Sequence, residues 1–483
     1  MLAPRASNAG IKFWALAVTL LNFTLSIPLL TNFDKTTWKW QFAEYKAWIS
    51  AWNINYALGI DGISILFVML SALVGILCVL VSWNAVTTKI KEFYVAILFI
   101  EGAMIGVFCA LDFFLFYIFW EAMLIPMYLL IGIWGGPGRL YATIKFFLFT
   151  LAGSLLMLVG IIILYLKSGG VFFIPELMSL SGSYPLKLQL LLWFAFFAAF
   201  AVKVPMLPVH TWLPDAHTEA PAAGSVILAA VLIKMGAYGF LRFSIPFFPE
   251  ATKLLAVPMM VLSVAAIIYG AVICFAQTDM KRLIAYSSVS HMGFITLGIF
   301  ALNTNGLEGG ILQMINHGVV TGGLFLMIGI IYERTHSREI AYYGGIAQKV
   351  PVYAVFFLIF TLSAIGFPAT NGFIGEFLVL LGGFTKNRTL GVLAATGVIL
   401  GAGYMLGLYR RMFFQPLSDN VKALVDLNLR ETLTLIPMFV LVFWIGLYPN
   451  VFLGFMHASV EHLIEQVSNG TGGMSLAQLL LER

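Results

Sequence analysis

The sequence predicts an all-α polytopic membrane protein. Of its 483 residues only 10% are charged and 61% are hydrophobic, and the mean hydropathy is +0.96. A soluble domain carries about 25% charged residues. Apolar runs of about 20 residues recur along the chain, the length that a helix needs to cross a hydrocarbon core. This pattern excludes a water-soluble enzyme, a disordered chain and a coiled coil, and barrel strands would instead alternate apolar with polar residues.

Thirteen apolar runs are expected to form transmembrane helices. They cover residues 11–30, 62–83, 93–110, 113–134, 146–166, 188–207, 222–244, 254–276, 283–301, 309–331, 351–383, 390–409 and 432–455. We group them into four regions: N-terminal spans with a long loop (1–92), a first five-helix repeat (93–244), a second repeat (245–413), and a C-terminal loop, span and tail (414–483).

Two of these spans contain helix breakers. The first break follows Lys203 at Pro205 and Pro208, and the second contains Gly366 and Pro368. Proline removes a backbone donor and clashes with the preceding turn, and such a break at membrane depth must be buried in protein or line a wet cavity. Each repeat has its broken helix in fourth place, and five helices is an odd number, so we expect the second repeat to be inverted relative to the first.

The distribution of Lys and Arg predicts the orientation in the membrane. With thirteen spans, 15 of these residues fall on the side of the N-terminus and 10 on the other side. Basic residues collect on the cytoplasmic side. The N-terminus is therefore predicted to be cytoplasmic and the C-terminus periplasmic, in a bacterial inner membrane.

A few ionisable residues lie inside the spans, where a charge costs about 2.5–3.5 kcal/mol at the bilayer centre. They are Glu101, Glu121, Lys203, Lys234, His291, His317 and Glu376. A buried lysine beside a carboxylate holds its proton, and desolvation favours release of the proton when the carboxylate moves away. Histidine is a suitable intermediate carrier. All of these except Glu101, whose role stays open, are predicted to form a proton relay in the order acid, base, base, His, His, acid.

Details around the relay residues suggest how protons could be held. Ser287, Ser288 and Ser290 precede His291 and could hold water, and Gln313 and Thr321 flank His317 on one helix face. We expect Glu376 to lie about 12 Å beyond Pro368 along its helix. An alternative for each histidine is a hydrogen-bonded contact between helices.

No metal or cofactor site is expected on this chain. The cysteines, Cys78, Cys109 and Cys274, form no CxxC pair, which argues against a Cys-ligated cluster. His210, Asp215 and His217 have spacings typical of metal ligands but lie in a proline-flanked connector, so capping and polar contacts are expected there instead. No nucleotide-binding loop or haem motif occurs, so an ion gradient or partner subunits must drive transport.

Three stretches resemble the antiporter-like membrane subunits of proton-pumping NADH:quinone oxidoreductase, respiratory complex I. They are Trp120–Pro126, Lys203–His217 and Gln277–Gly293. The likeness covers nearly the whole chain, and Glu376 favours the branch of chain M, the counterpart of mitochondrial subunit 4, because sister chains usually have lysine there.

The resemblance implies roles for individual residues. Glu121 and Lys203 would form a modulating pair, Lys234, His291 and His317 would carry the proton, and Glu376 would be the exit station. FMN, iron–sulfur clusters and quinone would be bound by partner subunits, among them the neighbouring chains L and N. The family usually has one further N-terminal span, so residues 5–30 correspond to its second. Two alternatives remain open: a subunit of a multisubunit sodium/proton antiporter or membrane-bound hydrogenase, and a purely structural membrane subunit.

Overall fold

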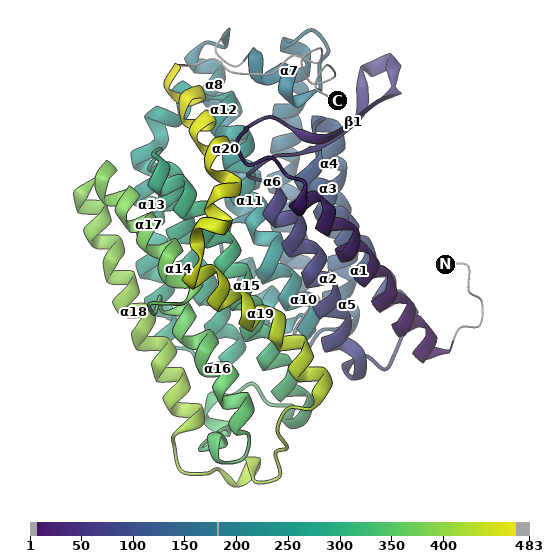
Figure 1. Cartoon of the computed structure of the whole chain (residues 1–483), viewed down its shortest axis with the longest axis vertical. Helices are drawn as coiled ribbons and strands as arrows, with labels where there is room; N and C mark the ends of the chain where they lie inside the picture. The colour runs from purple at the N-terminus through teal and green to yellow at the C-terminus, as the bar shows by residue number, and fades with distance from the viewer. Residues whose placement is uncertain (1–6, 181–182, 470–483) are drawn as a thin grey trace.

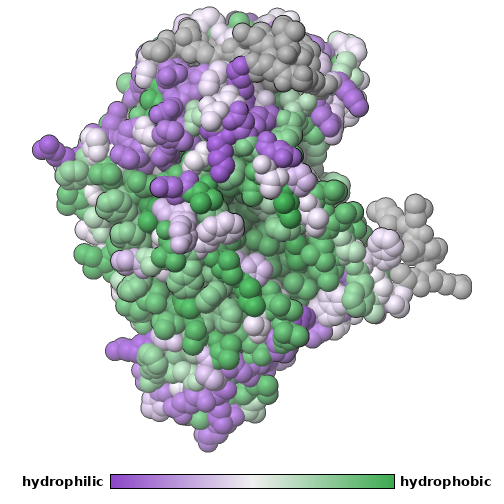
Figure 2. Space-filling view, viewed as in Figure 1, coloured by the Kyte–Doolittle hydropathy of each residue, from purple (hydrophilic) through white to green (hydrophobic). Residues whose placement is uncertain are grey.

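The computed structural model describes residues 7–180 and 183–469. Most of the long helices run roughly along the long axis of the molecule (Figure 1). The face seen in Figure 2 carries a hydrophobic band across the middle and hydrophilic regions at both ends. A band of this kind suits a chain whose middle is surrounded by lipid.

Twelve helices in the described part are long and apolar enough to cross a membrane. They are α1 (Asn8–Thr31), α2 (Ile65–Ala85), α3 (Ile90–Cys109), α4 with α5 (Phe113–Ala122, Leu124–Trp134), α6 (Arg139–Lys167), α8 (Leu186–Lys203), the run from α10 to α12 (Ala222–Phe247), α13 (Pro249–Phe275), α14 (Met280–Phe300), α15 (Thr304–Thr335), α18 (Arg388–Phe413) and α19 (Leu429–Leu447). The predicted span 351–383 is divided between α16 (Pro351–Ala364) and α17 (Asn371–Lys386).

Both predicted helix breaks occur. Helix α8 ends at Lys203, and the chain passes through a connector to the short helix α9 (Trp212–Glu219). In the second break Gly366 has a φ of +68°, a left-handed conformation that favours glycine. At the first break the Trp212 indole donates to the Val202 carbonyl at 2.9 Å, whereas Phe367 in the second break is 50% exposed. The inverted relation between the two repeats stays a prediction.

The run from α10 to α12 is not a regular α-helix. It consists of α10 (Ala222–Ile227), a π-helical stretch η3 (Leu228–Leu232), α11 (Ile233–Gly239), a second π-helical stretch η4 (Phe240–Ser244) and α12 (Ile245–Phe247). π-Helical turns often occur at functional sites because they free backbone carbonyls and shift side chains. Lys234 follows the first π-helical stretch directly.

The most buried helices form the centre of the bundle. In α15 and in the run from α10 to α12, the entire apolar window is buried, whereas in α1 only 17% is buried. Glycines allow the two central helices to approach closely, because a Cβ at Gly318 would stand 2.7 Å from the Ala230 carbonyl oxygen. The central pair therefore offers sites that lipid does not reach.

The sequence analysis treated residues 31–61 as a loop, and this was incomplete. Strands β1 (Gln41–Ile49) and β2 (Ile54–Ile60) form an antiparallel hairpin around the short 3₁₀ turn η1 (Ser50–Trp52). Asn53 takes the left-handed conformation at the turn, a role in which asparagine is favoured. The hairpin is tied to the bundle because the Asn55 amide donates to the Asp112 carboxylate at 3.0 Å.

The predicted last span, 432–455, was also wrong in its bounds. Helix α19 ends at Leu447 and α20 (Pro449–Asn469) continues in a new direction (Figure 1), because Pro449 cannot donate the hydrogen bond that would extend α19. The remaining short elements are α7 (Ile174–Ser179), η5 (Ile340–Tyr342), η6 (Ile346–Gln348) and η7 (Asp419–Val421).

A buried ion pair joins the start of α2 to the end of the run from α10 to α12. The Arg242 guanidinium lies 2.6 Å from the Asp61 carboxylate, with both side chains about 95% buried. It also donates to the Tyr238 hydroxyl at 3.2 Å and stacks on the Trp40 ring at 4.3 Å. The guanidinium thus has a counter-ion, a hydrogen-bond acceptor and an aromatic ring as partners.

Asp61→Asn is expected to destabilise the protein, because it leaves the Arg242 charge buried without its counter-ion, at a cost of about 3–5 kcal/mol. The measurement is the midpoint of thermal unfolding of the purified assembly. Glu250→Gln is the matched control, since Glu250 pairs with Lys253 at 57% and 40% side-chain exposure and an exposed pair contributes about 0–1 kcal/mol. Equal midpoints for both variants would contradict the prediction.

Candidate functional site

The predicted relay residues come from six different helices and are sheltered from lipid. Lys234 on α11 is fully buried, and Glu376 on α17 is 4% exposed. Lys203, His291 and His317 are also buried, while Glu121, at the end of α4, is half-buried. Neither Lys234 nor Glu376 faces the hydrocarbon, so the free-energy cost of placing a charged side chain in lipid is avoided.

Lys234 and His317 form the central contact of the site. The Lys234 ammonium nitrogen lies 2.6 Å from His317 Nδ1 and also donates to the Ala229 carbonyl in the π-helical stretch. The described residues place no carboxylate within 4 Å of Lys234. To accept from an ammonium, Nδ1 must carry a lone pair, so the proton of the neutral ring is on Nε2. The contact is therefore a direct route for a proton from lysine to histidine.

From His317 the polar contacts continue to His291 and then to Glu376. The two imidazole rings have their centroids 5.5 Å apart, and His291 Nδ1 lies 3.1 Å from the Glu376 carboxylate. A pocket of about 10 Å³ borders both rings, close to the smallest volume that holds a water. The spatial order is thus Lys234, His317, His291, Glu376. The sequence left the order of the two histidines open, and here His317 of α15, not His291 of α14, contacts the lysine.

The Glu376 carboxylate lies beside the helix break, and the continuous helix on which the expected 12 Å from Pro368 was based does not form. A Cβ at Gly366 would stand 2.8 Å from Glu376 Oε2. The expectation assumed a continuous helix from Pro368, but α17 begins only at Asn371, so the chain turns back and brings the carboxylate to the break. Gln313 of α15 donates to the same carboxylate at 3.2 Å, in agreement with the predicted polar face around His317.

Three polar side chains that the sequence analysis did not single out hold the second break in place. The Asn316 amide donates to the Asn371 carbonyl at 2.7 Å, and the Ser363 hydroxyl donates to the Asn371 side chain at 2.5 Å. These bonds connect α15, α16 and α17 around the break. The available signal was asparagine inside an apolar run, one residue before His317.

The serines before His291 have other partners than water. Ser287 and Ser288 both donate to the Ile284 carbonyl, and Ser290 donates to the Ile267 carbonyl of α13. Their hydroxyl protons are therefore occupied by backbone contacts. These bonds fix the serines within α14 and against α13, and their role in holding water stays a prediction.

Glu121 and Lys203 lie close enough to interact electrostatically but form no ion pair within 4 Å in the described part of the chain. Glu121 has the Ser154 hydroxyl of α6 as a hydrogen-bonding neighbour. The Lys203 ammonium lies 5.1 Å from the centre of the Trp120 ring, within the range of a cation–π interaction. The two side chains thus stand apart, and each has another partner nearby.

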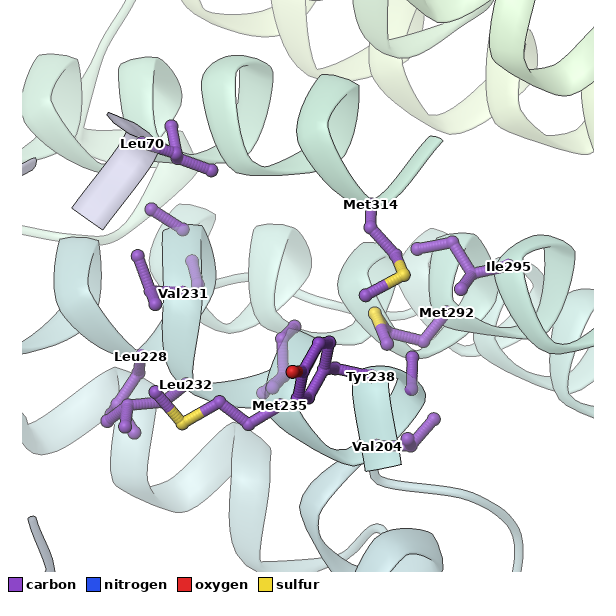
Figure 3. Close-up of a cluster of buried hydrophobic side chains, with 14 of the residues drawn as sticks. Leu70, Val204, Leu228, Val231, Leu232, Met235, Tyr238, Met292, Ile295 and Met314 are labelled. Atoms are coloured by element: carbon purple, nitrogen blue, oxygen red, sulfur yellow. The ribbon is translucent and has the colours of Figure 1, made fainter. Parts of the chain in front are cut away.

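A cluster of apolar side chains occupies the region near Lys203 and Lys234. Figure 3 shows side chains of this cluster, among them Val204, Met235, Tyr238 and Met292. Helices α8 and α11 nevertheless touch, because a Cβ at Gly236 would stand 2.8 Å from the Val204 backbone nitrogen. The two lysines share no described polar contact. The polar contacts of the described residues therefore run from Lys234 onwards, and Glu121 with Lys203 stands apart from them.

The remaining ionisable residues have separate surroundings. Glu101 accepts from the Asn22 amide of α1 at 2.6 Å and packs against Gly75. Asp215 pairs with Lys145 at 2.7 Å and with Arg282 at 3.6 Å, and His210 contacts the Tyr269 hydroxyl at 3.2 Å. No group of three His, Cys, Asp or Glu in the described residues is placed to hold a metal ion.

Comparisons with known proteins agree on one family. Residues 110–401 match the model of the family described as NADH:quinone oxidoreductase/Mrp antiporter, TM. NADH-quinone oxidoreductase subunit M of Rhodobacter capsulatus is 48% identical over 98% of this chain and 94% of its own length. A chain of respiratory complex I from Thermus thermophilus superposes with a TM-score of 0.87 at 33% identity, over 94% of this chain and 95% of that one. A chain of the Mrp complex from Dietzia sp. DQ12-45-1b has a TM-score of 0.83 at 20% identity, over 95% of each chain, which shows a shared fold.

Gly372→Ala is expected to destabilise the second break, because the new Cβ would overlap the Ser363 carbonyl oxygen. Overpacking of this kind costs about 1–3 kcal/mol, read as a lower midpoint of thermal unfolding of the purified assembly. Gly407→Ala on α18 is the control, since no heavy atom lies within 4 Å of its Cβ. The idea fails if Gly372→Ala unfolds at the same temperature as this control.

Proposed function

This chain belongs to the family of antiporter-like membrane subunits of NADH:quinone oxidoreductase, and we propose that six of its buried residues carry out or control proton transfer. It is a multi-span, proton-translocating membrane subunit of that respiratory complex and assembles with other membrane subunits of it. Lys234, His317, His291 and Glu376 form the conducting part, and Glu121 with Lys203 forms the controlling pair.

The observation that carries this assignment is the continuous series of contacts from Lys234 to Glu376. The distances are 2.6 Å from Lys234 to His317 and 3.1 Å from His291 to Glu376, with 5.5 Å between the two rings. Groups at such distances exchange protons directly or through one water, and each has a protonated and a neutral form. A packing role alone would not require four titratable groups in sequence.

The control step depends on charge. When Lys203 closes on Glu121, its positive charge is neutralised and Lys234 can hold a proton. When the pair opens, as it stands here, the positive charge of Lys203 is no longer compensated by Glu121. Its repulsion of the Lys234 ammonium in a low dielectric then favours transfer of the Lys234 proton to His317. Quinone reduction in partner subunits would supply the change that opens and closes the pair.

The remaining assignments concern the surroundings of the chain. The predicted orientation puts the N-terminus in the cytoplasm and the C-terminus in the periplasm of a bacterial inner membrane, with Glu376 as the exit station. Redox chemistry would belong to partner subunits with FMN, iron–sulfur clusters and quinone, and this chain would bind none of them. Its neighbours in the membrane would be the related chains L and N.

The alternative assignment to a sodium/proton antiporter or membrane-bound hydrogenase is tested by copurification. An affinity tag on this chain should recover a flavin- and iron–sulfur-containing assembly that oxidises NADH. Recovery of an assembly without flavin, or with hydrogenase activity, would replace the proposal.

Lys234→Ala is expected to lower NADH-driven proton pumping in reconstituted vesicles by about a hundredfold, because removal of a proton-transfer group typically costs that much. Glu121→Gln should also abolish pumping, because the charge that responds to Lys203 is lost. Both variants should lower quinone reductase activity in parallel, since pumping and reduction are coupled.

The matched control is Lys253→Ala, which removes a half-exposed lysine at a distance from the site. It should leave pumping and quinone reduction at wild-type levels. Normal pumping by Lys234→Ala in vesicles that hold a proton gradient would reject the proposed relay. Intact activity with altered assembly in Glu121→Gln would favour a structural role.

A further inference from the structure

The face of the bundle on which the N-terminus is predicted to lie contains a cavity of about 330 Å³. It lies between the ends of α2 and α5, the start of α14 and the last turns of α15, and it has room for about ten waters at roughly 30 Å³ each. Four charged side chains line it: Glu219, Lys281, Glu333 and Arg338. A polar, roomy cavity of this kind is suited to hold water that exchanges with the solvent.

His217 lies directly behind this cavity. Its ring stacks on the Phe325 ring, with centroids 4.6 Å apart and planes 10° from parallel, and Phe325 and Thr218 both line the cavity. The His217 side chain is fully buried, and neither ring nitrogen has a hydrogen-bond partner among residues 7–180 and 183–469. An unsatisfied buried polar atom costs about 1–3 kcal/mol. A phenylalanine would fill the same space without this cost, so packing does not explain the histidine.

The position of His217 connects the cavity with the relay. Its stacking partner Phe325 follows His317 by eight residues on α15, about 12 Å along the helix, and the residues at intervals of four, His317, Thr321 and Phe325, share one face. The charged and titratable groups that act on the His217 ring are Lys234, Lys281 and His317. His217 thus lies between the cavity of about 330 Å³ and the Lys234–His317 contact, and it can titrate.

We propose that His217 is the entry station for protons on the cytoplasmic side. One ring nitrogen takes a proton from water in the cavity, and the other releases a proton through transient water towards Lys234 and His317. The ring returns to its neutral form after each transfer, so one proton moves and no other bond changes. This inference rests on the proposed function of Lys234 and extends it by naming the residue that supplies its proton.

Chemical rescue distinguishes a proton carrier from a packing residue. His217→Gly opens a space beside the cavity that imidazole can enter. In the purified, reconstituted complex, NADH-driven pumping by this variant should fall about tenfold or more, while NADH oxidation with a water-soluble electron acceptor stays normal. Added imidazole should restore pumping in a concentration-dependent way. Pyrazole, which has the same size and shape but is far less basic, should not restore it.

The controls separate this inference from the proposed function. His210→Gly removes another buried histidine of the same connector, one that contacts Tyr269 and does not line the cavity, and its pumping should be unaffected by imidazole. If His217→Gly fails to assemble, His217→Gln keeps a polar side chain of similar size and should show the same loss. Equal rescue by imidazole and pyrazole, or wild-type pumping by His217→Gln, overturns the entry station. Wild-type pumping by Lys234→Ala would instead overturn the proposed function itself.

Discussion

The contact between Lys234 and His317 is the interaction on which the other features of the site depend. A lysine at membrane depth without a carboxylate partner is tolerated only where protein shields it from lipid, since a charge in hydrocarbon costs several kcal/mol. The two most buried helices provide that shield, and glycines such as Gly318 let them approach. The π-helical stretch before Lys234 adds a backbone carbonyl as a second acceptor. Burial, close helix packing and the irregular backbone thus all serve to keep the Lys234–His317 pair away from lipid.

The second helix break solves the corresponding problem for Glu376. A regular helix would carry this carboxylate away from His291, whereas the left-handed turn at Gly366 returns the chain and places the two side chains in contact. The free backbone groups of the break need partners because no water is available in hydrocarbon. Asn316 supplies one, and it stands next to His317 in the sequence. The same helix, α15, therefore holds the break and provides His317 of the proposed relay.

Much of this arrangement could be predicted from the sequence, because burial of an ionisable group in an apolar run leaves a clear signal. Lys203, Lys234 and Glu376 stand out against residues that lipid accepts, and proline marks both breaks. The order of the histidines could not be predicted, since it depends on which face of α14 and α15 meets α11, and periodicity alone does not decide between neighbouring helices. The hairpin at 41–60 was missed because its edge strand mixes polar and apolar residues like a loop. His217 was dismissed as part of a connector, since only the fold brings its ring against Phe325.

The two ends of the helix that carries Lys234 differ in a way that bears on direction. On one side lie His217 and a cavity with room for water. On the other, Arg242 follows Lys234 by eight residues, about 12 Å away, and its guanidinium is held by Asp61, Tyr238 and Trp40. A guanidinium stays protonated and cannot relay a proton, and its paired carboxylate is held as an acceptor. A proton that reaches Lys234 from the cavity therefore has no straight path onward through the first half. The path that remains for the proposed relay is lateral, through His317 and His291 to Glu376, so in this proposal the buried ion pair sets the direction of transfer as well as stabilising the fold.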